Sequence, residues 1–477
     1  MATGQGPGDG KRAVVVGAGI SGLAAAYDLR RAGVDYTLFE KQSRTGGVIQ
    51  TETGSGCILE CGPDSFLSAK PEALALIQEL GMESDVIGSN DAHRTTYIWK
   101  HERLVQLPEG VMMIVPSRAW PIVKSSLIGW PTKIRMGLEC FRKPGHSSGD
   151  RSVSEFVSDH FGKETLDYMA EPLLSGVYGG DPARLSIQSV LPRFLQMEEK
   201  YGSLVRGVLA AQAATSRSKE PRSKNGAAAP LFRTLRSGLG KLTATLANGA
   251  NLAHAEVEAI RRSEGTFELR VAGQWALADQ VILACPAWAA AKLISELDPA
   301  LAAVLGSIEY SSSLTLSLIY RASDFDGRRA GFGFLVPKVE RRRLAACTFV
   351  GTKFLHRVPE GRIVLRCFFG GAGDEAALAE SDEALIGIAR EELQRMLGLT
   401  AAPISHVISR WPRSMAQYTV GHQKRLEEIR RRVAQIPGLH LAGNAYEGIG
   451  IPDCIRTGRG AARAAIAAIS VPGKPAA

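Results

Sequence analysis

The sequence predicts an α/β fold with a doubly wound parallel sheet and a second, mixed sheet interleaved with it along the chain. The first observation is a βαβ unit, in which a strand-like run at 13–17 precedes a glycine-rich turn, a helix-forming segment and a second strand-like run at 34–40. The second is ADQVILACP at 278–286, a short buried strand stopped by a proline. The third is apolar alternation at 313–320 and 361–371, typical of antiparallel strands.

Size and composition indicate a multidomain globular protein. The chain has 477 residues, more than the roughly 250–300 at which single cores stop growing. Its 45% hydrophobic and 22% charged residues are ordinary values. The first ten residues lack the apolar centre of a signal peptide, and no apolar run approaches the roughly 18 residues that span a bilayer. We expect a protein that is soluble or lies on a membrane surface.

The formal net charge of +9 raises the question of nucleic-acid binding. Such binding needs the charge concentrated on one patch. The densest basic stretches lie at 216–224, 338–344 and 423–432. Apolar residues recur at helical spacing along the last of them, at Leu426, Ile429, Val433 and Ile436. Its arginines therefore form the solvent-exposed face of an amphipathic helix, and we expect no nucleic-acid partner.

Seven cysteines are scattered between residues 57 and 454. An odd number spread over a long chain does not form a disulfide framework. The nearest pair, Cys57 and Cys61, has no second pair or histidine couple at metal-binding spacing. We expect no metal site and a reducing, cytoplasmic compartment.

The glycine-rich turn after the first strand is a candidate dinucleotide site. Gly17, Gly19 and Gly22 form a GxGxxG pattern between strand and helix, and Glu40 closes the second strand. The first glycine allows the tight turn, the second a close approach to a pyrophosphate and the third close packing of helix on strand, while the glutamate accepts hydrogen bonds from a ribose. The intervening Ala18, Ile20 and Ser21 join the cofactor-binding set. The alternative is a glycine turn without a ligand.

A second glycine loop lies near the other end of the chain. Residues 443–450 are glycine-rich and precede the alanine-rich segment AARAAIAAIS. Alanine is the best helix former and glycine the poorest after proline, so the loop should deliver the chain to a helix N-terminus near residue 451. Helix N-termini attract anions.

Two further segments have distinctive compositions. The segment 99–130 holds tryptophans, basic residues and prolines, which typify a membrane interface or, equally, the core of a helical domain. Residues 211–230 contain almost nothing that could be buried and predict a linker.

The residues after Glu40 indicate which dinucleotide is bound. EKQSRTGGVIQT, at 40–51, has a basic residue four after the acidic one and then a Gly-Gly pair. It resembles the extension found in FAD enzymes of the amine-oxidase superfamily. The alternative for residues 40–51 is a plain connection between a helix and a strand. The resemblance implies that Arg44, Gly46 and Gly47 lie against the flavin side of FAD, and Lys41 joins the cofactor-binding set.

The stretch LAGNAYEGIGIPDCIRTGRGAA, at 441–462, resembles the closing motif of the same superfamily, which returns to the Rossmann-type domain and caps the flavin. This implies that Asp453 contacts the ribityl or pyrophosphate region and that Ile449 and Ile451 lie near the ring, and Gly450 between them joins the cofactor-binding set. Val257 completes the implied cofactor-binding set. The helix dipole would favour the negative charge that develops on the flavin upon reduction.

A narrower resemblance follows from GNAYEGIGIPDCIRTG, which looks like the closing signature of bacterial and organellar protoporphyrinogen oxidases. Further stretches agree at 60–67, 174–186, 331–337 and 411–425. The resemblance implies an FAD enzyme that oxidises protoporphyrinogen IX to protoporphyrin IX by three successive two-electron removals, each moving a hydride to the flavin while an N–H proton is lost. Oxygen would reoxidise the flavin and yield hydrogen peroxide.

The same resemblance implies which residues contact the substrate. Leu335 and Phe354 match family residues that sandwich the macrocycle, with core packing as the alternative for each. Gly176 matches a residue whose backbone carbonyl faces the tetrapyrrole and is the catalytic assignment. Arg94 matches an arginine that holds a propionate, with an ordinary surface arginine as the alternative.

The resemblance also divides the chain into interleaved domains. The FAD-binding domain is expected at 11–88, 237–293 and 406–470, a helical membrane-binding and substrate insertion at 89–205, a linker with substrate domain at 206–236, and the substrate domain at 294–405. No cysteine stands in an SGGC-like turn, so we expect non-covalent FAD. The insertion implies peripheral contact with the inner face of the cell membrane, and a homodimer is the default oligomer.

Three alternatives remain open from the sequence. Related bacterial enzymes act on coproporphyrinogen III, which has four propionates. Additional basic residues in the pocket would favour this substrate, and Arg94, Lys100 and Arg103 are candidates. An amine oxidase or carotenoid desaturase is a second enzyme class, for which Tyr446 alone is poor evidence of an aromatic pair. The third alternative is a carrier that binds flavin and tetrapyrrole without turnover.

Overall fold

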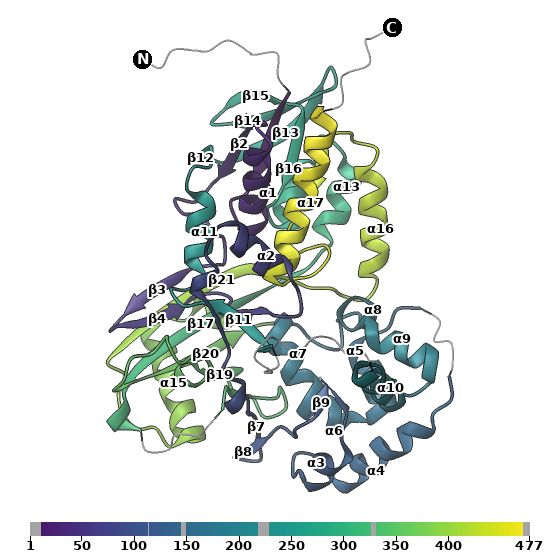
Figure 1. The fold of residues 1–477 in the computed structure, drawn as a ribbon, viewed down its shortest axis with the longest axis vertical. Coiled ribbons are helices and arrows are strands. Elements are labelled where there is room, and N and C mark those ends of the chain that lie inside the picture. The colour runs from purple at the N-terminus through teal and green to yellow at the C-terminus, as the bar shows by residue number, and fades with distance from the viewer. Residues whose placement is uncertain (1–10, 113, 145–148, 218–228, 326–330, 471–477) are drawn as a thin grey trace.

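The computed structural model describes residues 11–112, 114–144, 149–217, 229–325 and 331–470. Figure 1 shows three parts, with a parallel sheet at the top, a seven-stranded sheet at the lower left and a helical part at the lower right. The predicted α/β class with two interleaved sheets is confirmed.

The first part is built on a five-stranded sheet in the order β12-β2-β1-β16-β22, in which all neighbours pair in parallel. Its strands are β1 (Arg12–Val16), β2 (Asp35–Glu40), β12 (Leu252–His254), β16 (Gln280–Leu283) and β22 (Leu439–Leu441). The strands predicted at 13–17, 34–40 and 278–286 are therefore confirmed. Because β22 pairs only with β16, the sheet is completed by the C-terminal part of the chain.

Two helices from opposite ends of the chain pack on this sheet. They are α1 (Ile20–Arg31) and α17 (Ile451–Ser470), which lie side by side in Figure 1. A Cβ added to Gly458 of α17 would lie 2.1 Å from the carbonyl oxygen of Ser21, so only glycine permits this approach. The prediction of a glycine loop before a closing helix is confirmed. Alongside them pack α2 (Glu72–Glu79) and α11 (Gly240–Ala247).

An antiparallel sheet and three more helices complete this part. They are β13 (Val257–Ser263), β14 (Thr266–Val271), β15 (Gln274–Ala278), α12 (Ala287–Leu293), α13 (Pro299–Gly306) and α16 (His422–Val433). The amphipathic helix predicted around 423–432 is α16. It buries Leu426 and Ile429 and exposes Arg430 and Arg431.

The second part is a seven-stranded sheet in the order β21-β17-β20-β19-β18-β7-β8. Its strands are β7 (Thr96–Lys100), β8 (Arg103–Gln106), β17 (Tyr310–Arg321), β18 (Gly333–Leu335), β19 (Ala346–Phe349), β20 (Arg362–Gly370) and β21 (Ser405–Ala416). The predicted antiparallel pair is β17 with β20. One face of the sheet packs against α15 (Asp382–Leu397) in a core that includes Leu316, Phe334 and Leu393. The other face is turned toward the first part.

Short strands join the two sheets. The hairpin β3 (Thr51–Gly54) and β4 (Cys57–Glu60) leads into a small sheet of β5 (Phe66–Leu67), β11 (Phe232–Leu235) and β6 (Val86–Gly88). The short helix α14 (Val350–Lys353) follows β19.

The third part is helical. It comprises β9 (Val111–Met112), β10 (Val115–Pro116), α3 (Ala119–Lys124), α4 (Trp130–Leu138), η3 (Glu139–Phe141), α5 (Val153–Phe161), α6 (Lys163–Thr165), α7 (Glu171–Tyr178), α8 (Ile187–Val190), α9 (Pro192–Tyr201) and α10 (Leu204–Arg217). The predicted linker at 211–230 is wrong over its first part, because alanines extend α10 to Arg217, and 218–228 lie outside the described residues. Across the part of the chain that the structure describes, no helix is both long and apolar enough to cross a membrane.

Candidate active site

The predicted glycine turn forms an open cradle at the end of β1. Gly17 has φ +102°, and its amide donates to the carbonyl of Phe39 at 2.8 Å. A Cβ on Gly22 would lie 1.9 Å from the Gly17 oxygen, whereas a Cβ on Gly19 would meet nothing within 4 Å. Gly19 caps α1 without a side-chain hydrogen bond, and the first turn, which contains buried Ile20 and Ser21, has no acidic residue. The amides of the first turn of α1, which have no acceptor within the helix, and the open space at Gly19 fit a pyrophosphate.

Glu40 is fixed beside this cradle. Its Oε2 accepts from the amide of Ala18 at 2.8 Å and its Oε1 from the amide of Gln42 at 2.9 Å. A carboxylate offers about four lone-pair sites, so capacity remains for ribose hydroxyls. His254 of β12 is the register partner of Glu40, and buried Val257 opens β13 three residues later. The structure thus brings Ala18, Glu40 and the Val257 segment to one edge of the sheet.

The Gly46–Gly47 loop lies against the same cradle. The amide of Gly46 donates to the carbonyl of Ala18 at 2.8 Å, and a Cβ on Gly47 would lie 3.3 Å from Cα of Gly19. Both glycines have positive φ, +95° and +59°. This is the position that the resemblance gives to the flavin side of the cofactor.

Two predicted basic residues of this loop stack on tryptophans. The guanidinium of Arg44 lies 5.5 Å from the ring centroid of Trp411, and Nζ of Lys41 lies 5.9 Å from that of Trp288. Trp411 belongs to β21, so Arg44 connects the cradle to the seven-stranded sheet.

The first turn of α17 meets the first turn of α1. Cys454 hydrogen-bonds to Ser21, and burial raises the pKa of its thiol to about 12. Ile451 and Asp453 are buried, while Ile449 and Gly450 are partly exposed at the helix entry. A Cβ on Gly448 would lie 2.4 Å from Cγ of Asp453, which explains the glycine with φ +115° at that position. The predicted residues of the closing motif therefore join those of the first glycine turn.

One face of the seven-stranded sheet presents a row of side chains to the cradle. Successive register partners across four strands are Leu335, Ala346, Phe368 and Thr315. Directly opposite residues share a face, so these side chains point the same way. The Thr315 hydroxyl donates to the carbonyl of Cys61 at 2.7 Å, which shows that this face is turned toward the first part. Leu335 and Phe368 are only partly buried and offer an apolar platform.

Gly176 lies beside this platform. A Cβ on Gly176 would be 3.6 Å from Cδ2 of Leu335. The helix α7 ends at Tyr178, so the Gly176 carbonyl has no amide four residues later within the helix and can accept another donor. The structure brings together these two predicted substrate residues.

Phe354 has different surroundings. It is 1% exposed, and the centroid of its ring lies 5.0 Å from the Arg357 guanidinium and 5.3 Å from Nζ of Lys353. The assignment of Phe354 to the substrate stays a prediction, and Phe368, the partly exposed aromatic in the row of Leu335, was not assigned from the sequence. The alternation of Arg366 and Phe368 in RIVLRCFFGG was the available signal.

The predicted basic residues near 94–103 separate into two groups. Arg94 is exposed two residues before β7, the neighbour of β18, and has no hydrogen-bond or ion-pair partner among the described residues. Lys100 is buried, donates to the carbonyl of Leu127 at 2.8 Å and to Glu164 at 2.9 Å, and is therefore committed to the helical part. Arg103 lies exposed on the outer strand β8.

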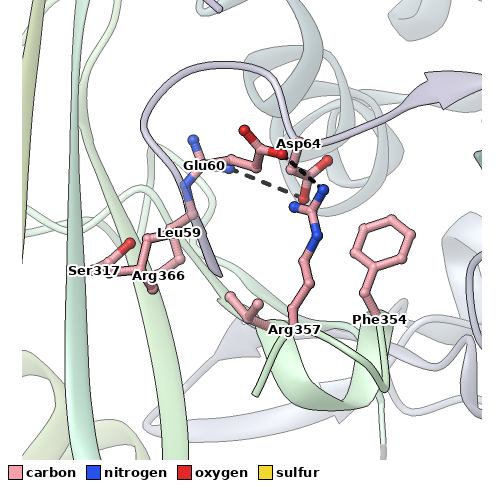
Figure 2. A pocket seen from close by; sticks show the side chains of 8 residues that line it. Leu59, Glu60, Asp64, Ser317, Phe354, Arg357 and Arg366 are labelled. Atoms are coloured by element: carbon pink, nitrogen blue, oxygen red, sulfur yellow. Dashed lines mark hydrogen bonds and ion pairs between the residues drawn. The ribbon is translucent and has the colours of Figure 1, made fainter. Parts of the chain in front are cut away.

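A cluster of buried and partly buried charges lies below the loop that follows β4 (Figure 2). Arg357 pairs with Glu60 at 2.7 Å and also donates to the Thr234 hydroxyl. Lys353 pairs with Asp64 at 2.8 Å, and Arg366 lies 4.0 Å from the same carboxylate. Burial acts to raise the pKa of Asp64, but Lys353 and Arg366 hold it well below its usual range.

A second buried network braces the helical part. His160 lies between Glu139, 2.8 Å from its Nδ1, and Glu198, 3.2 Å from its Nε2. Arg151 pairs with both Glu198 and Asp159. The carboxylates already have cationic or amide partners, so this group is a structural ion network.

A glycine-lined cradle lies at two adjoining helix N-termini and faces an apolar sheet platform. This arrangement defines a protein that binds a dinucleotide cofactor. The residues present fit FAD: the cradle would hold the pyrophosphate, Glu40 the ribose and the Gly46–Gly47 loop the flavin side. Residues 20–466 match the family model described as flavin containing amine oxidoreductase. The chain belongs to this family and is an FAD-dependent oxidoreductase.

Individual relatives agree over nearly the full length. The chain is 34% identical to coproporphyrinogen III oxidase of Bacillus subtilis, covering 95% of this chain and 97% of the relative. It is 26% identical to the chloroplastic/mitochondrial protoporphyrinogen oxidase 2 of Arabidopsis thaliana, covering 94% and 92%. The crystal structure of a proposed protoporphyrinogen oxidase from Exiguobacterium sp. 255-15 superposes with a TM-score of 0.83 at 29% identity, covering 96% and 99%.

Proposed function

We propose that this protein oxidises coproporphyrinogen III to coproporphyrin III in haem biosynthesis. The observation that carries the proposal is the 34% identity over 95% of the chain to an enzyme named for that substrate. The plant protoporphyrinogen oxidase is less similar, at 26% identity. Protoporphyrinogen IX, the substrate expected first from the sequence, is the rival within the same chemistry.

The reaction removes six hydrogens from the porphyrinogen and reduces three molecules of oxygen to hydrogen peroxide. FAD held in the cradle of Gly17, Gly19 and Gly22 would supply an acceptor for a hydride from the macrocycle that oxygen can reoxidise. Aromatisation drives the chemistry, so the protein contributes mainly position.

The side chains around the platform have complementary roles. Leu335 and Phe368 offer an apolar surface for the flat sides of the macrocycle. The Gly176 carbonyl, at the end of α7, is an acceptor for a pyrrole N–H. Arg94, two residues before β7, has a planar guanidinium without a partner among the described residues, and it suits a propionate.

The test is an anaerobic mixture of the purified yellow protein with coproporphyrinogen III and, separately, with protoporphyrinogen IX. Loss of the oxidised flavin absorbance together with porphyrin fluorescence should be faster with coproporphyrinogen III. Faster reaction with protoporphyrinogen IX would reverse the substrate assignment, and an unreduced flavin with both would overturn porphyrinogen oxidation.

A surface of the helical part favours contact with an anionic membrane. Trp120, Trp130 and Phe141 are 65%, 63% and 77% exposed, and Ile134 and Leu138 lie among them on α4. Lys124 and Lys133 stack on the two tryptophans, with Nζ 5.0 and 4.7 Å from the ring centroids. We name this surface the α3/α4 face. Exposed aromatic rings beside cations suit the headgroup region of anionic lipids.

Cosedimentation with vesicles tests the α3/α4 face. Wild-type protein should bind vesicles containing anionic lipid, and the double variant Trp120→Ser with Trp130→Ser should not. Trp275→Ser is the matched control, because Trp275 is also exposed, at 38%, but lies on β15 in the first part. Equal binding by the double variant would contradict the assignment.

A further inference from the structure

Side chains of the seven-stranded sheet clamp a loop of the first part. The carbonyl of Cys61 accepts from the Thr315 hydroxyl at 2.7 Å and from Nε1 of Trp411 at 2.8 Å. The carbonyl of Gly62 accepts from the guanidinium of Arg366. Residues 61–64, here called the clamped loop, are thus held by three strands of the sheet.

The clamped loop touches the flavin side of the cradle. A Cβ on Gly62 would lie 1.8 Å from the carbonyl oxygen of Val48, the residue after Gly47. Gly47 in turn packs on Gly19 at the N-terminus of α1. Only a short series of backbone contacts therefore separates Arg366 from the cofactor cradle.

The charges beneath the clamped loop do not balance. Glu60 and Arg357 form one neutral pair, each with a side chain 1% exposed. In the second group the single carboxylate of Asp64 faces two cations, Lys353 and Arg366; Figure 2 shows Asp64 and Arg366. Nε of Arg366 is buried and has no acceptor among the described residues. Burial lowers the pKa of Arg366, as expected for a cation that lacks full compensation.

An uncompensated buried cation is costly unless an anion forms nearby. A substrate carboxylate cannot reach Arg366, whose side chain is 3% exposed. The flavin itself becomes anionic during turnover, because a hydride delivers two electrons with one proton and so adds one negative charge. We propose that Arg366 is a positioning residue that holds the clamped loop and whose unbalanced charge stabilises the negative charge on reduced FAD.

The test is the midpoint potential of bound FAD, measured by anaerobic reductive titration against a reference dye. Arg366→Met removes the excess cation and should shift the equilibrium about tenfold toward oxidised FAD, which is about 30 mV for a two-electron couple. Asp64→Asn removes the opposing carboxylate and should shift it by a similar factor in the other direction. Arg366→Lys keeps the charge and should leave the potential near that of the wild type.

A matched control uses the neutral pair. The double variant Glu60→Gln with Arg357→Met disturbs burial equally but leaves net charge unchanged, so its potential should not move. Should Arg366→Met fail to retain FAD, Lys353→Met removes a cation from the same group and should also favour oxidised FAD. Shifts of the same sign for Asp64→Asn and for the cation variant, or no shift in either, would overturn the proposal. The titration uses no porphyrinogen, so its outcome is independent of the proposed substrate.

Discussion

Nζ of Lys70 lies 2.5 Å from Oδ2 of Asp453, joining the loop before α2 to the first turn of α17 across 383 residues of sequence. The Asp453 side chain is 10% exposed and that of Lys70 is 43% exposed. A carboxylate at a helix N-terminus is favourable, and the lysine reduces its repulsion toward a phosphate.

Removing this lysine should weaken cofactor binding. In Lys70→Ala the Asp453 carboxylate would face the pyrophosphate without its cation, and we expect the dissociation constant of FAD to rise about tenfold. Fluorescence titration of the apoprotein measures this. Lys241→Ala is a suitable control, because its ion pair with Asp85 is longer, at 3.6 Å, and similarly exposed. Equal affinity in Lys70→Ala would show that the pair does not serve the cofactor.

The contact between α1 and α17 should not tolerate a methyl group. Gly458→Ala places Cβ 2.1 Å from the Ser21 oxygen, so we expect a loss of about 1–3 kcal/mol in the free energy of unfolding, with weaker FAD binding. Gly460→Ala on the same helix meets nothing within 4 Å and should be neutral or slightly stabilising. Chemical unfolding of both variants compares them directly, and equal stability would contradict the close approach.

Acid should destabilise the protein partly through His422. Burial, with Arg425 nearby, lowers the pKa of His422 to about 4, and its ring stacks on Tyr418 at 4.2 Å. Between pH 6.5, its usual value, and about 4 the unfolded chain binds a proton that the folded protein does not. The contribution of neutral His422 to the free energy of unfolding is therefore fully present above pH 6.5. It is lost as the pH falls toward about 4, and the loss amounts to about 3 kcal/mol.

His422→Phe keeps the stacked ring but cannot titrate. From pH 7.5 to pH 4, the free energy of unfolding of the wild type should fall by more than that of this variant. A difference that stays constant over that range would show that His422 does not cause the acid sensitivity.

A side chain at position 176 should interfere with substrate and leave the fold intact. In Gly176→Ala the new Cβ makes an ordinary 3.6 Å contact with Leu335 on the platform. We expect unchanged or slightly higher thermal stability, because alanine favours helix, together with a KM raised several-fold. Gly137→Ala, in the open surroundings of α4, is the control and should leave KM unchanged. An unaltered KM in Gly176→Ala would place the substrate elsewhere.

The flavin should leave the protein on denaturation. The thiols of Cys285 and Cys454 have a pKa raised by burial to about 12, which makes them poor nucleophiles for a covalent bond to FAD. Acid precipitation should release the yellow chromophore into the supernatant, and a coloured pellet would contradict non-covalent binding.

The cradle could be predicted from the sequence because its determinants are local. Gly17, Gly19, Gly22 and Glu40 stand at spacings fixed by one βαβ unit, and the structure places them together. The platform was only partly predictable. Whether Phe368 shares a face with Leu335 depends on the register of the three strands β18, β19 and β20, whereas Phe354 directly follows α14. The register of non-local pairs is not specified by local sequence.

Charge in the interior was harder still to predict. Lys100 was considered from the sequence as a basic residue for the substrate and Arg366 was not singled out, yet both are buried. Their hydrogen-bond partners come from segments more than 25 residues away. The tryptophan-rich segment 99–130 also divides: Trp99 is 2% exposed in the seven-stranded sheet, whereas Trp120 and Trp130 lie on the α3/α4 face. Composition left a membrane interface and a helical core equally open for the segment and could not separate its tryptophans.

The pairing of α1 with α17 has a consequence for biosynthesis on the ribosome. The first strand and the glycine turn emerge early, but their packing surface and the Asp453 turn are translated only after residue 450. The packing surface of α1 therefore stays incomplete until synthesis is nearly finished, and we expect FAD to bind late. Ribosome-stalled chains ending before α17 should fail to retain FAD, and a premature stop in this helix would leave an empty, protease-sensitive polypeptide.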